Sequence, residues 1–329
     1  MENSKTPFNN GAYIEKQTKL IEKRINDTGS RMYLEVGGKL FEDMHGSRVL
    51  PGFLPDNKMR ILSHFTDRAC VIVAVSADDI QSGKKKHDNG LSYAQDAVMT
   101  ALRFSKLGIP LCGIAITRYK GQERAEKFSE MISEKGFRCI FNRFMRGYPT
   151  DTQLVVSEKG FGRNGFLETD RDLVIVTGPG PGSGKMETCL SQIYGEKKRG
   201  NTAGYSKFET FPVYDLELKH PLNLAYEAAT ADLGDVNMYD PFHLKAYGIK
   251  AVSYNRDTEA FPVLSALLTA VNGSCPYRSP TDMGINAVGQ CIEDDEAVRE
   301  ASKQEILRRL DQCSDPREYE RIKQIAQLI

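Results

Sequence analysis

The sequence has 329 residues, with 44 basic and 44 acidic side chains and a formal net charge of zero. This length allows about two domains with sizeable buried cores, and the balanced charge argues against nucleic acid as a partner. The scattered cysteines form no CxxC pair, which argues against a disulfide framework or zinc knuckle. Because the chain has neither a signal-peptide pattern nor a long apolar run, we expect a cytoplasmic enzyme with no membrane contact. The oligomeric state stays open.

The first predicted element is an amphipathic helix near the amino terminus. Ile14, Ile21 and Ile25 recur at helical spacing among charged residues, and Gly29 marks the end of the pattern.

Short apolar runs bounded by turn residues follow and predict buried strands. These runs are 32–36, 70–75, 111–117, 139–141 and 173–176. Helical patterns at 92–108 and 121–136 separate some of them. Apolar strands that alternate with helices imply a mainly parallel sheet sandwiched by helices. We therefore predict an α/β fold, with residues 1–200 as a phosphate-binding domain that includes the N-terminal helix.

Beyond residue 200 the pattern changes to helix-like segments separated by turns with Pro and Gly. These segments are 220–235, 260–273 and 294–312. We predict that 201–329 form a second, mostly helical domain. The segment 273–290 has no clear period, and long loops of this kind are usually functional or mobile.

The strongest local motif is "TGPGPGSGK" at 177–185, directly after the apolar run "LVIV". A P-loop has the pattern G-x-x-x-x-G-K-[ST], in which backbone N–H groups surround a phosphate and the hydroxyl residue binds magnesium. Here Pro179 replaces the first glycine and Met186 replaces the hydroxyl residue, so the match is P-loop-like and partial.

The context still favours phosphate binding, because glycines allow close backbone approach and a helix start presents unpaired N–H donors. A purely structural strand-to-helix turn is the alternative. The predicted ligand-binding residues are Gly178, Gly180, Gly182, Ser183, Gly184 and Lys185, with Thr188 as a substitute hydroxyl.

Long, unusual blocks run through the chain, among them "LEVGGKLFEDMHGSRVLPGF", "TGPGPGSGKMETCLSQIY", "YNRDTEAFPVL" and "SPTDMGINAVG". Together they resemble the bacterial family catalogued as domain of unknown function 1846, over essentially the whole chain. The resemblance implies an α/β protein with an attached helical subdomain, and implies no activity. It also implies that family members continue past Ile329, so that this chain lacks their C-terminal part.

Two further groups of residues suggest ligands at the ends of strands. Gly37-Gly38-Lys39 and Arg48 suggest a second anion-binding corner, and a glycine turn with solvated charges is an equal alternative. Asp78 and Asp79 follow the strand 70–75, where carboxylates could hold the magnesium that Met186 cannot bind. Capping of the next turn by these aspartates is the alternative.

The second half of the chain supplies candidate catalytic residues, namely His243, Arg256, Asp257 and Asp282. A transferase needs a cation for phosphoryl charge and a carboxylate or imidazole for the acceptor hydroxyl. Surface salt bridges and helix caps are the alternative. The histidines show no zinc-binding spacing.

These patterns favour an enzyme dependent on ATP or another nucleotide with Mg²⁺, a phosphotransferase or ligase acting on a small polar metabolite. One alternative is a nucleotide-free enzyme acting on a phosphorylated metabolite. The other is a non-catalytic sensor of such a small-molecule phosphorylated ligand.

Overall fold

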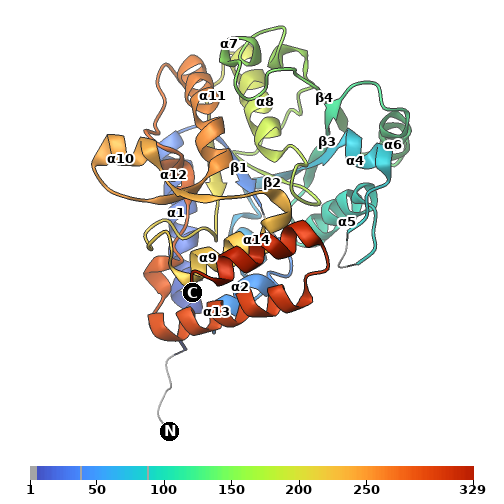
Figure 1. Ribbon diagram of the computed structural model, residues 1–329. Helices are drawn as coiled ribbons and strands as arrows, with labels where there is room; N and C mark the ends of the chain where they lie inside the picture. Colours follow the sequence, from blue (N-terminus) through green and yellow to red (C-terminus); the bar gives the residue numbers. More distant parts are fainter. Residues whose placement is uncertain (1–5, 38, 87–88) are drawn as a thin grey trace.

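The computed structural model describes residues 6–37, 39–86 and 89–329 (Figure 1). The helices are α1 Asn10–Thr28, α2 Met44–Val49, α3 Asn57–Leu62, α4 Ala77–Ser82, α5 Tyr93–Lys106, α6 Glu123–Glu134, α7 Thr152–Val155, α8 Lys185–Lys198, α9 Pro221–Ala229, α10 Pro241–Tyr247, α11 Asn255–Asn272, α12 Pro280–Met283, α13 Asp295–Gln312 and α14 Pro316–Ala326. The strands are β1 Arg31–Val36, β2 Ala69–Ser76, β3 Leu111–Tyr119, β4 Cys139–Arg143, β5 Leu173–Thr177, β6 Ala203–Phe208, β7 Asn237–Tyr239, β8 Val252–Tyr254 and β9 Gly284–Ile285.

The centre of the fold is a 7-stranded sheet in the order β4-β3-β2-β5-β1-β6-β9, and every pairing within it is parallel. A separate antiparallel pair joins β7 and β8. The predicted α/β fold with a mainly parallel sheet between helices is therefore confirmed. Since parallel strands all end at one edge, the loops after β1, β2, β3, β5 and β6 share that edge.

The sheet extends past residue 200. β6 pairs with β1 from Arg31 opposite Ala203, and β9 pairs with β6 at Lys207 opposite Gly284. The sheet therefore includes residues on both sides of the predicted domain boundary at residue 200. That the two parts fold independently remains a prediction.

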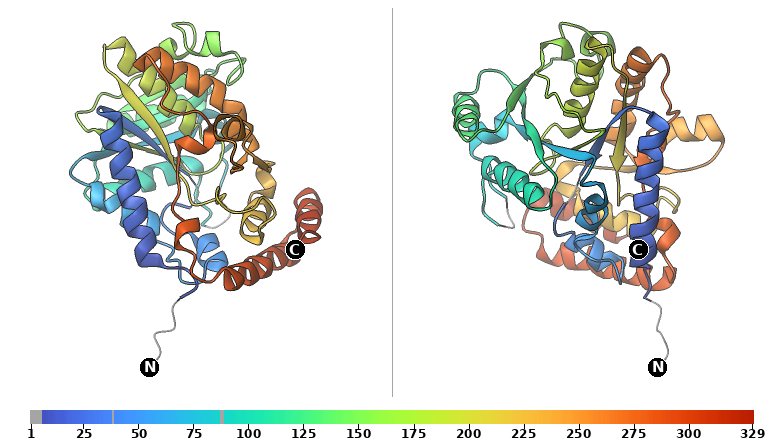
Figure 2. Two further views of the ribbon diagram at one scale, coloured as in Figure 1. Left: turned by 90° about the vertical axis from the view of Figure 1, so that its left-hand side faces the viewer. Right: turned by 180° about the vertical axis from the view of Figure 1, so that it is seen from behind.

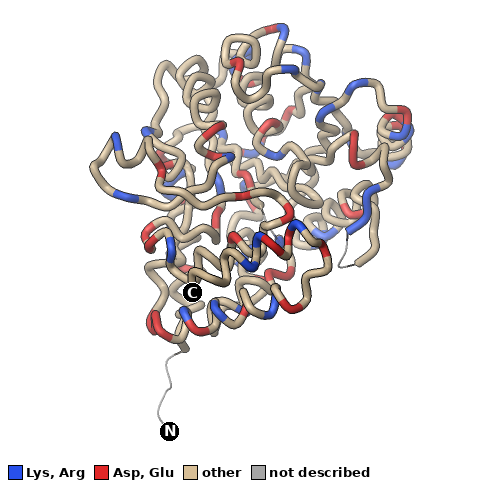
Figure 3. The backbone as a smooth tube through the Cα atoms, in the orientation of Figure 1, with Lys and Arg blue, Asp and Glu red and all other residues tan. Residues whose placement is uncertain are grey.

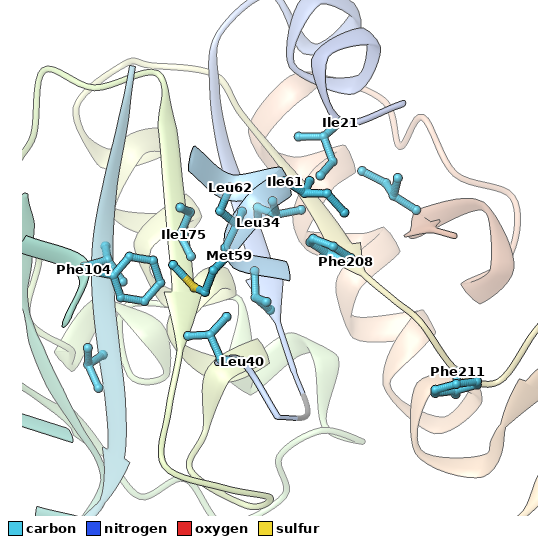
Figure 4. Close-up of a cluster of buried hydrophobic side chains, with 14 of the residues drawn as sticks. Ile21, Leu34, Leu40, Met59, Ile61, Leu62, Phe104, Ile175, Phe208 and Phe211 are labelled. Carbon is cyan, nitrogen blue, oxygen red and sulfur yellow. The ribbon is translucent and has the colours of Figure 1, made fainter. Parts of the chain in front are cut away.

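Both faces of the sheet are buried because successive strand residues alternate between two apolar clusters. Leu34 and Ile175 lie in the larger cluster, together with residues of α1, α3 and α5 (Figure 4). Tyr33 and Val174 lie in the other cluster, with residues of α8 and α11. Because helices cover both faces, the strand segments of the sequence are apolar at nearly every position.

The C-terminal helices α13 and α14 lie beside α2 and α9 at one end of the molecule, and Figure 2 shows them from two further sides. Acidic and basic residues alternate over these helices, as Figure 3 shows. Among the described helices, none has the length and apolar character needed to cross a membrane.

Candidate functional site

The predicted strand-to-helix unit is present. β5 is fully buried between β2 and β1, and α8 begins at Lys185, so residues 178–184 form the connection that we call the glycine loop. Gly184 is the N-cap of α8 and supplies no side-chain cap. The first N–H groups of α8 therefore point out of the helix without an acceptor inside it, at the positive end of its dipole.

The glycine loop is held closely against its neighbours. A Cβ on Gly178 would lie 2.3 Å from the carbonyl oxygen of Ala74, and the Thr117 hydroxyl donates a 2.8 Å hydrogen bond to the carbonyl of Ser183. The Ser183 side chain is buried, and its Oγ has no hydrogen-bond partner among the described residues. The loop thus has a fixed shape and an unused hydroxyl.

Lys185 reaches from the glycine loop toward β1. Its Nζ donates to the carbonyl of Gly180 at 3.3 Å, and its Cε lies 3.9 Å from where a Cβ on Gly37 would stand. Burial lowers the pKa of Lys185; Glu35 opposes this shift and Lys207 adds to it. The amine therefore lies where a further negative charge would stabilise its protonated form.

A group of charged side chains gathers at the same edge of the sheet. We call Glu35, Lys185, Lys207, Glu209 and Asp257 the carboxyl-edge cluster. Lys207 Nζ lies 2.5 Å from Asp257 Oδ2 and 3.2 Å from Glu209 Oε1. Burial opposes the charge of Lys207, but Asp257 beside it holds the pKa of the amine well above its usual range. Glu35 on β1 accepts a 2.8 Å hydrogen bond from a tyrosine hydroxyl of β6.

Two carboxyl groups, Glu209 of this cluster and Glu187 of α8, have raised pKa values. Burial raises the pKa of Glu209 to about 7, although Lys207 opposes the shift. Burial likewise raises the pKa of Glu187, in the first turn of α8, to about 7, with Arg118 opposing. A carboxyl group with a pKa near the working pH can both give and take a proton, as acid–base catalysis requires.

The four predicted catalytic residues fall into two pairs. Asp257 belongs to the carboxyl-edge cluster, and Arg256 beside it in α11 pairs through Nε with Asp235 at 2.7 Å. His243 Nδ1 lies 3.0 Å from a serine hydroxyl and 3.6 Å from Asp282 Oδ1, so this second pair joins α10 to α12. Catalysis by any of them stays a prediction.

Asp78 and Asp79 lie in the first turn of α4, and both contact polar side chains of the protein. Asp78 accepts a 2.8 Å hydrogen bond from Gln122, and Asp79 lies 3.6 Å from Lys84 Nζ. The N-cap of α4 is Ser76 and not one of these aspartates. In the described parts of the chain, no group of three or more His, Cys, Asp or Glu could hold a metal ion.

The predicted second anion-binding corner is only partly described. Gly38 lies outside the described residues, and the carbonyl of Lys39 accepts a hydrogen bond from Lys58. Arg48 Nε lies 2.8 Å from Glu305, an ion pair that joins α2 to α13. Arg48 therefore has a structural contact at the end of the molecule where the C-terminal helices pack.

Thr188, the predicted substitute hydroxyl, lies inside α8, and its contact with a ligand stays a prediction. It is fully buried, donates a 2.8 Å hydrogen bond to the carbonyl of Gly184 and accepts one from Asn142. These contacts occupy the hydroxyl of Thr188.

Sequence reasoning missed Glu35, Lys207, Glu209 and Glu187. One signal was available, because Glu35 and Lys207 are charged residues inside strands that are otherwise buried, and such charges are retained only when paired. Nothing in the local sequence indicated that burial would raise the pKa of Glu187 and Glu209.

The family model described as "Domain of unknown function DUF1846, N-terminal" matches residues 6–327. The chain belongs to this family. The DUF1846 chain is 50% identical over 306 residues to a UPF0371 protein of Corynebacterium efficiens, an alignment that covers 93% of this chain and 62% of the relative. It is 49% identical over 305 residues to a UPF0371 protein of Streptococcus thermophilus, with 93% and 62% covered. The chain thus spans about three fifths of the curated relatives that it matches, and their names state no activity.

Proposed function

We propose that the DUF1846 chain binds the phosphate group of a small ligand at the glycine loop and belongs to an enzyme of phosphoryl transfer or ligation. The observation that carries the proposal is the position of Lys185. A lysine at a helix start faces the positive end of the dipole, which costs up to about 1 kcal/mol, and partial burial adds to this cost. A bound phosphate would offset both effects.

The surrounding residues support a reaction at this place. The free N–H groups of α8 and the amine of Lys185 would hold the phosphate. Lys207 and Arg256 carry positive charge that can stabilise a transferred phosphoryl group. Glu209 and Glu187, with pKa values near 7, would exchange protons with the acceptor. The acceptor in this proposal is a small polar metabolite.

ATP or another nucleotide is the leading donor in this proposal, but the residues do not fit a magnesium site well. Met186 takes the place of the hydroxyl ligand, and Asp78 and Asp79 already contact Gln122 and Lys84. No step of the proposed reaction uses magnesium. The same observation favours a second candidate, a nucleotide-free enzyme that acts on a phosphorylated metabolite. A sensor that binds without turnover is the third.

Ligand-induced thermal stabilisation tests the proposal and separates these candidates. The panel contains ATP and GTP with and without Mg²⁺, inorganic phosphate and several sugar phosphates. A ligand at 100 times its Kd should add about 2.7 kcal/mol to the stability of the wild type. Lys185→Ala should melt at or slightly above the wild-type temperature without ligand and lose the ligand-induced shift.

Lys197→Ala is the matched control, because Lys197 is exposed in the last turn of the same helix. It should keep the full shift. Stabilisation by ATP or GTP supports the nucleotide enzyme, and stabilisation by sugar phosphates alone supports the nucleotide-free one. If no phosphorylated compound stabilises the wild type, or Lys185→Ala keeps the shift, phosphate binding at this loop is wrong.

A further inference from the structure

The opposite edge of the sheet carries a second polar site that the proposed function does not use. The amino ends of β2 and β3 and the segment before β5 line an open surface depression. Two cysteines, Cys70 and Cys112, lie in its floor, and Arg138, Thr169 and Arg171 stand around them. Since the strands of the 7-stranded sheet are all parallel, this edge is remote from the glycine loop, and the two cysteines are independent of phosphate binding there.

An irregularity in the sheet accounts for the closeness of the two thiols. β2 and β3 pair with Val71 opposite Leu111 and Ile72 opposite Gly113, so the register shifts at Cys112. Cys70 and Cys112 both point into the apolar cluster on the α8 side of the sheet. Neighbouring strands are about 4.8 Å apart, so two side chains that leave adjacent strands on the same face of the sheet lie side by side.

Polar groups surround the sulfur atoms, which is unusual for buried cysteines. Cys70 Sγ lies 3.4 Å from the Thr169 hydroxyl, and Arg138 donates to Cys112 Sγ at 3.4 Å. The neighbouring Cys112 thiol lowers the pKa of Cys70 against the effect of burial, and Thr169 and Arg31 add to the lowering. The neighbouring Cys70 thiol and burial raise the pKa of Cys112. A low-pKa thiol beside a second thiol is the arrangement of redox-sensitive pairs.

We propose that Cys70 and Cys112 form a redox-sensitive dithiol that a hydroperoxide converts into an intramolecular disulfide. The oxidant must be small, because the two residues are only 2% and 3% exposed. Hydrogen peroxide meets this requirement.

The reaction has two steps. The Cys70 thiolate attacks one peroxide oxygen, an S–O bond forms as the O–O bond breaks, and the departing hydroxide takes a proton and leaves as water. The Cys112 sulfur then attacks the Cys70 sulfenic acid, an S–S bond forms as the S–O bond breaks, and the hydroxide leaves as water with the Cys112 proton. The two thiols supply the two electrons that reduce the peroxide.

The test treats the intact chain with hydrogen peroxide and maps its peptides by mass spectrometry without reduction. We expect a cross-linked peptide pair containing Cys70 and Cys112, lighter by two hydrogens, that dithiothreitol separates again. Cys313→Ser removes a cysteine elsewhere in the fold and should leave this cross-link unchanged. Cross-linking of any other pair, or irreversible oxidation without a cross-link, overturns the proposal.

Single variants test the order of the steps. Cys112→Ser should accumulate a Cys70 sulfenic acid that dimedone labels, whereas Cys70→Ser should leave Cys112 unlabelled. Dimedone label on Cys112 instead would overturn the assignment of Cys70 as the attacking thiol. Thr169→Val keeps both sulfur atoms and should slow disulfide formation several-fold, so the proposal stays testable if a serine variant does not fold. An unchanged rate would contradict the role of the Thr169 hydroxyl.

Discussion

Glu187 places a carboxyl group in the buried first turn of α8, and burial raises its pKa from the usual 4.5 to about 7. Between these two pH values the folded state binds the proton more tightly than the unfolded state. The contribution of protonated Glu187 to the free energy of unfolding is therefore fully present below about pH 4.5 and is lost as the pH rises through about 7. Its size is about 3 kcal/mol at most, since one pKa unit corresponds to about 1.4 kcal/mol.

Glu187→Gln should reduce the loss of stability between pH 5 and pH 8, because glutamine stays neutral throughout. We compare the free energy of unfolding of the variant with that of the wild type at each pH. This difference should be about 1–3 kcal/mol more favourable to the variant at pH 8 than at pH 5. Urea unfolding at a series of pH values measures this difference. Glu130→Gln, at an exposed position of α6, is the control and should follow the wild type. Parallel pH profiles for Glu187→Gln and the wild type would show that the carboxylate is not destabilised by burial.

The sequence predicted Lys185 but not the charged groups around it. The glycine loop can be recognised from the sequence, because all its residues are contiguous. The partners of Lys207 are contributed by different parts of the chain, Glu209 just after β6 and Asp257 in α11. Their convergence depends on tertiary packing, which no local pattern encodes.

The residue at position 184 of the glycine loop must be glycine for two reasons. Its φ is 83°, in the left-handed region, and a Cβ would lie 2.6 Å from the Thr117 hydroxyl oxygen. Gly182 also has a positive φ of 71°, but a Cβ at this position would meet nothing within 4 Å. The two positions separate the cost of the backbone conformation from the cost of the close contact.

Gly182→Ala should destabilise the chain by about 1 kcal/mol, the cost of a left-handed alanine. Gly184→Ala should cost about 2–4 kcal/mol, because overpacking against Thr117 adds to the same backbone term. Denaturant unfolding of both variants measures the difference. Equal losses would mean that β3 and the loop can move apart at little cost.

The contact between α2 and α13 depends on one carboxylate. Glu305 is 2% exposed and pairs with Arg48, Arg308 and Arg309. Burial alone would raise the pKa of Glu305. The hydrogen bond from Arg308, the neighbouring His45 and the charges of Arg309 and Arg48 instead hold the pKa well below its usual range. The stabilisation is present above pH 4.5 and is lost as the pH falls toward the lowered pKa.

Glu305→Gln should lower the free energy of unfolding by about 3 kcal/mol at pH 7, because three arginines lose their carboxylate. The deficit should shrink at low pH, where the wild-type carboxylate is also protonated. Glu300→Gln, in the same helix but exposed, should change stability by less than about 0.5 kcal/mol. A deficit that does not depend on pH would point to lost packing instead of lost charge.

The strand pattern could be predicted where the strands are uniformly apolar. β2 and β5 have this character, and their sequences "CVIVAV" and "LVIV" lie within the observed bounds. The strand β6 was missed because "AGYSKF" contains a glycine, a serine and Lys207, which weaken an apolar pattern. The very short β9 has too few residues to carry a periodic signal.

The sheet and the helices that cover it predict how a truncated chain would fold. A fragment of residues 1–200 would lose β6, which pairs with β1, and α11, which covers one face of the sheet. We expect this fragment to show no cooperative unfolding transition in urea, monitored by circular dichroism, whereas the full chain shows one. A cooperative transition of the fragment would support residues 1–200 as an independent folding unit.

The strand β1 lies between β5 and β6, and its pairing begins at Leu173 and Ala203. On a ribosome that adds about 5–20 residues per second, roughly 10 to 30 s separate the synthesis of β1 from that of β6. Closing such long loops is entropically costly, and a high contact order slows folding. The nascent chain therefore carries an apolar strand with open edges during this interval. We expect efficient folding in the cell to require chaperones that shield β1 until its late neighbours emerge.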